Sequence, residues 1–351
     1  MVFGIGATSR NLAAFAFCIA GVTAMPAASA QTVDGPAVQW DIALYGNPRS
    51  VTIVFDETAK MVEEATGGKF KIKNHYGATL APEREILDGL SIGAYQGGWV
   101  VVSYAPGKLV AAGGLDLPFI PVTTLNALQE VQDSYLRLPE VDNDFKRWGA
   151  KYLAPSGLPF YEFLGKGRPL QAVADFKGLR LRGLGGLGDA IRAVGGVPTT
   201  FTSSELYPAL ERGLLDGLSM GYYAHQAWKI HEVATWYTKG MALTPPVSLS
   251  LVNLKAFEAL PPQYQRLVAE KAVAGANIQL AALQKGEDDA EADFIKKGVK
   301  RIDFTAAERD KLAEQGGKPV WAKWVQEVTA KGYPGQKLLD FIMTAAKKAS
   351  S

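Results

Sequence analysis

The sequence predicts an α/β fold with two lobes, and three observations support this prediction. Strand-like and helix-like runs alternate along the chain with short connections, which is typical of α/β proteins. The pattern breaks near residues 155 and 245, so the chain is expected to cross into a second lobe and return to the first. The run from Gln263 to Lys297 contains no proline and only two glycines. It therefore predicts one long helix of about 50 Å at 1.5 Å per residue.

The first lobe is expected to begin with strands and helices in alternation. Strands are predicted in VQWDIALY (Val38–Tyr45), in the alternating run FKIKNHY and in the buried run GGWVVVSY. Residues 51–68 place their apolar side chains near one helical face and end at two glycines, and EREILDGL predicts a short helix. Residues 123–148 then follow a helical pattern.

The second lobe and the return to the first are predicted from shorter runs. Strands are expected in KYLAP and FYEFLG around residue 155, and then in LRLR, VPTTFT and DGLSM. VSLSLVN (Val247–Asn253) reads as the returning strand. Pro261 and Pro262 are typical of a helix start. VKRIDF predicts one more strand, and the remainder is helical.

The N-terminal residues have the form of a secretory signal peptide. Residues 1–30 carry Arg10 as their only charge, followed by an apolar run, Pro26 and small residues at Ala28 and Ala30. We therefore expect export and cleavage after Ala30; a buried N-terminal helix is the alternative. The apolar run is too short to anchor the chain across a bilayer.

Export would leave a chain that depends on its own core. The single cysteine, Cys18, lies in the predicted signal, so no disulfide and no cysteine-based metal site is expected. Loss of Arg10 leaves 36 basic and 35 acidic residues. This near-neutral balance gives no reason to expect nucleic acid or a membrane surface as a partner.

The stretch LRLRGLGGLGDAIRAVGG contains Gly183, Gly185 and Gly188 in the spacing of a dinucleotide-binding turn. Such a turn needs an apolar strand before it and an acidic residue at the end of a second strand about 20 positions later. Here the strand places Arg180 and Arg182 on one face, and the acidic residue at that offset lies in a helix-start pattern. A dinucleotide site is therefore not favoured, and no cofactor is expected.

The same residues describe a corner that suits a carboxylate. The glycines allow a ligand to approach the backbone closely at the end of a strand. A helix that starts near Gly188 would direct its first N–H groups to that place. Arg182, at the strand end, offers a planar guanidinium that matches a carboxylate. We therefore predict that Arg182 anchors a small organic acid.

Several stretches together resemble the solute-binding subunits of tripartite ATP-independent periplasmic (TRAP) transporters, the DctP type. Their matching segments are VEEATGGKFKIKNHYGATLAPEREILDGLSIG (Val62–Gly93), LDLPFI (Leu115–Ile120), DFKGLRLR (Asp175–Arg182), AVGGVPTTFTSSELYPALERGLLDG (Ala193–Gly217), LPPQYQRLV and KPVWAKWV. LRLR and ELYPALERG are the most specific of these. The last arginine of the family's D-[LF]-K-G-[LM]-[KR]-[IL]-R motif binds the ligand carboxylate, and it corresponds to Arg182.

The resemblance implies a two-lobe periplasmic binding protein fold with hinge strands and a long helix spanning both lobes. We expect a signal peptide at 1–30, a first lobe from 31–155 with 246–280, a second lobe at 156–245, and C-terminal helices at 281–351 that pack across the lobes. The partners implied are a small organic carboxylate and membrane permease subunits. A sensor kinase that reads the closed form is a further alternative, and a monomer is expected.

The ligand site is predicted to lie between the lobes. Besides Arg182, its candidate residues are Tyr45, Asn47, Trp99, Phe160, Tyr161, Glu162, Gly185, Met220, Tyr222 and Tyr223. Glu162 stands near the place where sugar-acid and dicarboxylate binders of the family often have a second arginine. Leu218, Ser219 and Met220 stand where the family often has polar ligand contacts. One anchor with an aromatic wall indicates a monocarboxylate with an apolar or aromatic body.

Two other functions stay open at this stage. A C4-dicarboxylate or sugar-acid binder would share the fold and the anchor. A periplasmic enzyme acting on a small carboxylic acid is the alternative from another class, but the sequence contains no G-x-S-x-G, no H-E-x-x-H and no paired-carboxylate motif. The three histidines are too scattered in the sequence to predict a metal site.

Overall fold

The computed structural model describes Met1 and residues 32–350. The predicted signal peptide and its cleavage position lie outside the described residues. From Thr32 onward the chain forms one compact unit. None of its described helices is long and apolar enough to cross a membrane.

The first lobe is built on a five-stranded sheet in the order β2-β1-β3-β10-β4. Its strands are β1 (Val38–Ala43), β2 (Phe70–His75), β3 (Gly97–Val101), β4 (Ala150–Pro155) and β10 (Ser248–Asn253). β1 pairs parallel with β2 and β3, whereas the returning strand β10 pairs antiparallel with β3 and β4. The returning strand thus enters the middle of the sheet and ties the two passages of the chain together.

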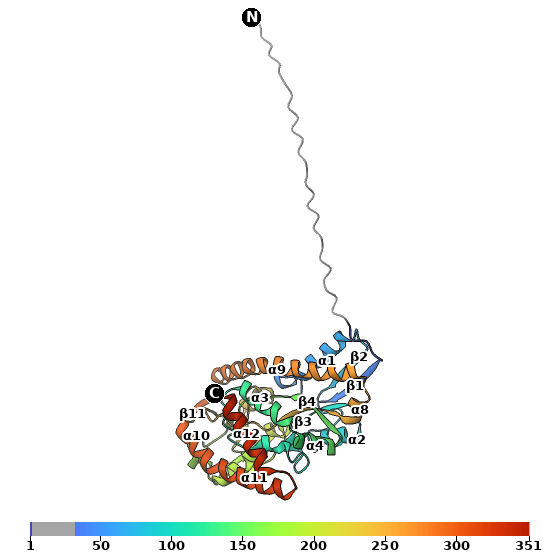
Figure 1. Ribbon diagram of the computed structural model, residues 1–351. Coiled ribbons are helices and arrows are strands. Elements are labelled where there is room, and N and C mark those ends of the chain that lie inside the picture. The colour runs from blue at the N-terminus through green and yellow to red at the C-terminus, as the bar shows by residue number, and fades with distance from the viewer. Residues whose placement is uncertain (2–31, 351) are drawn as a thin grey trace. The chain divides into compact units, whose positions relative to one another are not determined.

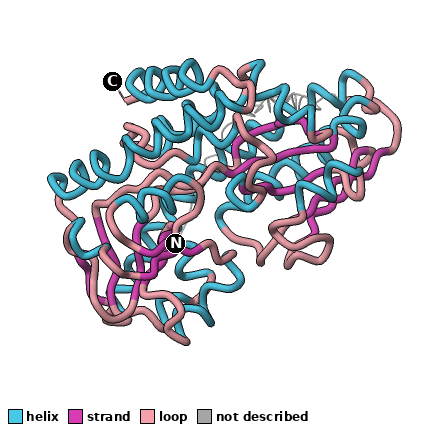
Figure 2. The backbone as a smooth tube through the Cα atoms, turned by 90° about the horizontal axis from the view of Figure 1, so that it is seen from below, coloured by secondary structure: helices cyan, strands magenta, loops and turns pink. Residues whose placement is uncertain are grey.

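The second lobe contains a six-stranded sheet in the order β11-β9-β5-β8-β6-β7. Its strands are β5 (Glu162–Gly165), β6 (Arg180–Arg182), β7 (Val197–Thr199), β8 (Gly217–Met220), β9 (Trp236–Lys239) and β11 (Lys300–Asp303). β6 lies between β7 and β8 and is parallel to both. In Figure 2 the strands gather in two separate groups, which agrees with the two sheets.

Helices cover both sheets. They are α1 (Ile53–Ala65), α2 (Ile86–Ile92), α3 (Leu125–Leu136), α4 (Pro139–Arg147), α5 (Gly186–Ala193), α6 (Leu206–Glu211), α7 (Tyr222–Ala227), α8 (Leu254–Glu258), α9 (Pro262–Lys296), α10 (Ala306–Leu312), α11 (Lys318–Ala330) and α12 (Gly335–Ala349). The helical pattern predicted at 123–148 is two helices rather than one. Pro139 has no N–H to donate, so it begins α4 instead of continuing α3.

The long helix α9 joins the lobes, as its uninterrupted pattern predicted. Its 35 residues pack on α1 of the first lobe and on α7 of the second, and Figure 1 shows it running along one side of the molecule. Buried Gln279 fixes its position: the amide oxygen accepts from the backbone N–H of Val54 at 3.1 Å, and Nε2 donates to the carbonyl of Gly157 at 2.9 Å. Gly275 allows close approach, because a Cβ there would lie 2.8 Å from the Val54 oxygen.

The structure confirms the α/β class and the two lobes, with three differences in detail. β9 has no counterpart among the predicted strands: it has only four residues, and its pairing with β5 and β11 establishes it. β11, predicted as a strand in VKRIDF but assigned to the C-terminal region, completes the second sheet. β3 ends at Val101, and a 3-10 turn at Val102–Tyr104 replaces the rest of the predicted strand.

The C-terminal helices contact both lobes. α11 packs on α5 of the second lobe, and α12 packs on α3 of the first. Trp321 of α11 donates from its indole nitrogen to the carbonyl of Pro118 at 2.8 Å, and Lys323 reaches Asp189 of α5 at 2.9 Å. The C-terminal helices therefore contact elements of both lobes, and the domain bounds at 281–351 stay a prediction.

Candidate functional site

Arg182 lies at the end of β6 and is almost fully buried, with 1% of its surface exposed. Three neutral acceptors receive its hydrogen bonds. Nη1 donates to the carbonyl of Ser219 at 2.8 Å, Nε to the carbonyl of Phe201 at 3.3 Å, and Nη2 to the hydroxyl of Tyr104 at 3.0 Å. A guanidinium has five N–H groups, so two remain available to a ligand.

No carboxylate in residues 32–350 lies within ion-pair distance of Arg182. Removing a charge from water without a counter-charge is costly, and proteins normally pair such groups. The neighbouring Arg180 shows the usual arrangement, since it is exposed and pairs with Asp216 at 2.7 Å. An anion bound beside Arg182 would supply the missing negative charge.

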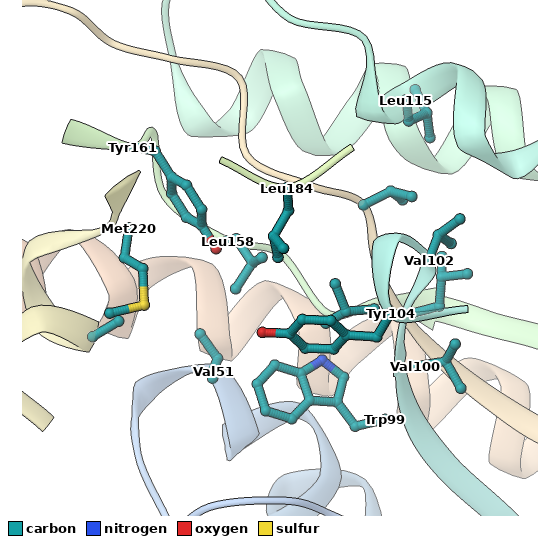
Figure 3. Packing of buried hydrophobic residues seen from close by; sticks show 14 of the residues in the cluster. Val51, Trp99, Val100, Val102, Tyr104, Leu115, Leu158, Tyr161, Leu184 and Met220 are labelled. Atoms are coloured by element: carbon teal, nitrogen blue, oxygen red, sulfur yellow. The ribbon is translucent and has the colours of Figure 1, made fainter. Parts of the chain in front are cut away.

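A small cavity lies next to this arginine, between the lobes. Its lining residues are mostly aromatic or aliphatic: Tyr45, Arg49, Trp99, Val101, Tyr104, Leu158, Tyr161, Leu184, Ser203, Met220, Tyr223, Ala224, Trp228 and Pro246. Figure 3 shows the side chains of Tyr104, Tyr161 and Met220 directed toward one space beside Leu158. Arg182 itself does not line the cavity, because Tyr104 covers its Nη2 group.

The aromatic wall is rigidly packed on the first-lobe side. The rings of Tyr45 and Trp99 are stacked, with centroids 4.3 Å apart and planes 1° from parallel. Tyr104 meets Tyr45 edge-on at 6.1 Å, and the Trp99 indole N–H donates to the hydroxyl of Ser248. Burial raises the pKa of Tyr45 well above its usual value, so its hydroxyl remains protonated.

The lobes meet at the edges of this cavity. The Tyr104 hydroxyl lies 3.1 Å from the Ser203 hydroxyl, and both residues line the cavity. Outside the cavity, Arg84 donates from Nη2 to the carbonyl of Thr200 at 2.8 Å. The cavity offers about 20 Å³ to the centre of a water molecule, which is room for little more than one water. An organic acid therefore enters only when the lobes separate or the lining side chains move.

Six of the predicted ligand residues meet at this place. Tyr45, Trp99, Tyr161, Met220 and Tyr223 line the cavity, and Arg182 lies directly behind Tyr104. They come from both lobes: Trp99 lies within β3, Met220 ends β8, and Tyr223 lies in α7. Their role in ligand binding remains a prediction that this arrangement supports.

Glu162 lies elsewhere and corrects the expectation of a ligand contact. Its carboxylate accepts from the backbone N–H groups of Gly240 at 2.9 Å and Ala242 at 3.0 Å, and from the hydroxyl of Thr238 at 2.7 Å. Burial raises the pKa of Glu162, and these hydrogen bonds oppose the rise. The side chain thus holds the chain where it leaves β9 and turns back toward the first lobe.

Four further candidates are also placed away from the cavity. Tyr222 packs against Tyr237 and Phe294 and donates to the carbonyl of Thr238, so it belongs to the core of the second lobe. Asn47 lies in an exposed outer crevice. Phe160 is only partly buried and packs on the core beside the hinge.

Gly185 is the fourth of these candidates, and it packs against Asp116 of the first lobe. A Cβ at Gly185 would lie 2.9 Å from the Asp116 carboxylate, and its φ of 52° favours glycine. The beginning of α5 therefore meets the first lobe instead of the cavity. Burial raises the pKa of Asp116 to about 6, although it accepts from the N–H of Val247 at 2.6 Å.

Nine of the cavity's lining residues were not predicted as ligand contacts, and three of them are large polar or aromatic side chains: Tyr104, Arg49 and Trp228. Tyr104 follows β3 through the 3-10 turn that directs it toward the second lobe. Arg49 and Trp228 face each other across the lobes, with the guanidinium carbon 5.6 Å from the indole centroid. Ligand-binding residues often lie just after the end of a strand. This rule could have identified Tyr104, which follows β3, and Arg49, which follows β1 in the stretch YGNPRS. Trp228 has no comparable signal.

α9 also reaches the cavity wall through Glu287. Its two carboxylate oxygens accept from the backbone N–H groups of Tyr222 and Tyr223, each at 3.0 Å, at the start of α7. Burial is the main cause that raises the pKa of Glu287 to about 7. The long helix thereby holds the segment that carries Tyr223, and couples the cavity wall to the element that joins the lobes.

Replacement of Glu162 by alanine should destabilise the fold without removing the ligand site. One buried donor, the Thr238 hydroxyl, and two partly buried backbone N–H groups would lose their acceptor. An unsatisfied buried group costs about 1–3 kcal/mol, and a group that water can reach costs less. We expect the free energy of unfolding in urea to fall by roughly 2–4 kcal/mol, while the dissociation constant of the bound acid changes by less than about threefold. Unchanged stability with lost binding would instead return Glu162 to the ligand site.

The chain was compared with known proteins. The model of the family "Bacterial extracellular solute-binding protein, family 7" (DctP) matches residues 49–327. A monocarboxylate 2-oxoacid-binding periplasmic protein of Nostoc sp. is 27% identical over 278 residues, which are 77% of this chain and 75% of that protein.

Two solved structures share the fold. One is a TRAP periplasmic solute-binding protein from Desulfovibrio salexigens with bound orotic acid, with a TM-score of 0.81, 22% identity and coverage of 89% of this chain and 99% of that chain. Another, from Roseobacter denitrificans with bound β-D-glucuronate, has a TM-score of 0.76, 20% identity and coverage of 87% and 99%. Since the family model covers most of the sequence, the chain belongs to the DctP family of bacterial extracellular solute-binding proteins.

Proposed function

We propose that this protein captures a small organic monocarboxylate with an apolar or aromatic body and delivers it to a membrane permease. The single observation that carries the proposal is the buried, unpaired guanidinium of Arg182 beside an aromatic cavity. The ligand carboxylate would take the two free N–H groups of Arg182 and provide its counter-charge. The lobes would then close over the ligand by a hinge movement.

The lining of the cavity favours this ligand class over the alternatives. Six lining residues are tyrosine or tryptophan, and no acid or amide side chain lines the cavity. Sugar acids present many hydroxyl donors, which are usually matched by carboxylate or amide acceptors, whereas a flat or branched apolar body packs on aromatic rings. The 2-oxoacid named for the Nostoc relative and the orotic acid of the Desulfovibrio structure agree with a monocarboxylate, while the glucuronate of the Roseobacter protein keeps the sugar-acid alternative open.

A thermal-shift screen of residues 31–351 tests the ligand class. The panel contains aromatic monocarboxylates, branched 2-oxo acids, C4-dicarboxylates and sugar acids. A ligand at about 100 times its dissociation constant stabilises the folded state by about 2.7 kcal/mol, which raises the melting temperature by several degrees. We expect a shift with monocarboxylates only. A shift confined to dicarboxylates or sugar acids would keep the family but refute the proposed ligand class.

We propose that the membrane permease is the partner that binds the closed form of the protein. Export to the periplasm and cleavage after Ala30 are part of the same proposal, because the ligand must meet the protein outside the inner membrane. A pull-down from membranes with the tagged protein and its bound acid tests this proposal. Recovery of permease subunits would support the permease as the partner. Recovery of a sensor kinase alone would favour the alternative.

A further inference from the structure

Arg49 is the only charged residue that lines the cavity, and its guanidinium is only partly used by the protein. Nη1 donates to the carbonyls of Tyr45 at 3.1 Å and Asn47 at 2.7 Å. Within residues 32–350, Nε and Nη2 have no hydrogen-bond partner, and no carboxylate lies within ion-pair distance. The Nε and Nη2 groups of Arg49 are therefore free to donate to a bound ligand, and no carboxylate of the described residues offsets its positive charge.

Aromatic rings from both lobes hold the Arg49 guanidinium in place. Its central carbon lies 4.8 Å from the Trp99 ring and 5.4 Å from the Tyr45 ring on the first lobe, and 5.6 Å from the Trp228 ring on the second. Such contacts are favourable at these distances and position the cation without neutralising it. The contact with Trp228 forms only when the two lobes are close together, as they are in this structure.

Arg49 stands at the side of the cavity that opens outward. Arg49 and Trp228 line both the inner cavity and the outer crevice formed by Gly46, Asn47, Pro48, Gly77, Ala78, Glu83, Ser204 and Ala227. Arg49 therefore lines the cavity directly, whereas Arg182 lies behind the Tyr104 side chain.

The remaining polar groups of the cavity are hydroxyls that can donate. Tyr45, Tyr161 and Tyr223 are each more than nine-tenths buried, and none of their hydroxyls has a hydrogen-bond partner in the described part of the chain. Burial raises the pKa of all three, so they stay neutral donors. No carboxylate lines the cavity to receive an ammonium group. The lining suits a ligand with electron-rich oxygens at more than one point.

We infer that Arg49 is a second ligand-binding residue, which contacts the end of the ligand away from Arg182 and selects acids that carry a second acceptor oxygen there. A ring hydroxyl or an oxo group opposite the carboxylate has the required chemistry. The inference rests on the proposed function, because it needs the carboxylate to lie at Arg182. Amino acids are excluded, since their ammonium group would face two unpaired cations.

Two pairs of probes test this: benzoate with 4-hydroxybenzoate, and phenylacetate with 4-hydroxyphenylacetate. Dissociation constants are measured by calorimetry for the unmodified protein, for Arg49→Met and for Arg137→Met. Arg137 is the matched control, because its guanidinium carbon also lies over a tyrosine ring (Tyr152, 5.3 Å) but does not line the cavity. We expect the unmodified protein and the control to favour the hydroxylated acid by roughly tenfold in at least one pair, and Arg49→Met to reduce that preference to about twofold or less.

The preference ratio separates a contact from a purely structural role, since a structural defect weakens both members of a pair equally. An unchanged ratio in Arg49→Met, or no preference in the unmodified protein, overturns the inference. If in either case Arg182→Met still abolishes binding of these acids, the proposed function stands. Failure of the unmodified protein to bind any of the four acids overturns the inference; it overturns the proposed function as well only if the thermal-shift screen finds no other monocarboxylate that binds.

Discussion

Arg182→Met should weaken binding of the carboxylate ligand by about 30-fold to several thousand-fold. Breaking a buried, hydrogen-bonded charge pair costs roughly 2–5 kcal/mol, and each 1.4 kcal/mol is a factor of ten in affinity. Methionine fills much of the space of the side chain but offers no donor to the acid. Isothermal titration calorimetry with the acid found in the screen measures the effect, and circular dichroism establishes that the variant is folded.

Arg180→Met is the matched control for this experiment. Arg180 lies two residues earlier on the same strand, but it is exposed and pairs with Asp216 at the surface. Its loss should leave the dissociation constant within about threefold, because exposed ion pairs contribute about 1 kcal/mol or less. Equal effects of the two substitutions would mean that Arg182 does not contact the ligand.

Gly186→Ala should lower the affinity by obstructing the contact between the lobes. A Cβ at Gly186 would lie 2.7 Å from the Asp116 carbonyl oxygen and 2.7 Å from Cδ of Pro118, and both belong to the other lobe. Overpacking of this kind costs about 1–3 kcal/mol. Because the cost falls on the closed form, we expect the dissociation constant to rise roughly 5-fold to 150-fold.

Small-angle X-ray scattering with saturating ligand checks the mechanism of this effect, since Gly186→Ala should remain more extended than the unmodified protein. Gly113→Ala is the control: Gly113 and Gly186 both line a further crevice, together with Asp116 and Leu117, but a Cβ at Gly113 meets no other atom within 4 Å. Its affinity should be unchanged. A Gly186→Ala protein that binds the acid as tightly as the unmodified protein would show that the closed contact seen here is not required for binding.

Much of this protein could be predicted from local sequence. Alternating and helical periodicity predicted most strands and the long helix α9, because each element must turn one face or both toward a core. The D-F-K-G-L-R-L-R stretch predicted Arg182, since a strand end followed by glycines and a helix is a local feature. These predictions needed no knowledge of which distant segments meet.

Only the tertiary structure decided which side chains reach the cavity. Tyr222 and Tyr223 are adjacent, yet one enters the second-lobe core and the other lines the cavity. Glu162 was expected at the ligand and instead holds the turn at Gly240, because β5 pairs with β9 beside it. Arg49 lines the cavity beside Trp228 of the second lobe. Such outcomes depend on pairing and closure between segments far apart in the sequence, and local periodicity contains no information about those contacts.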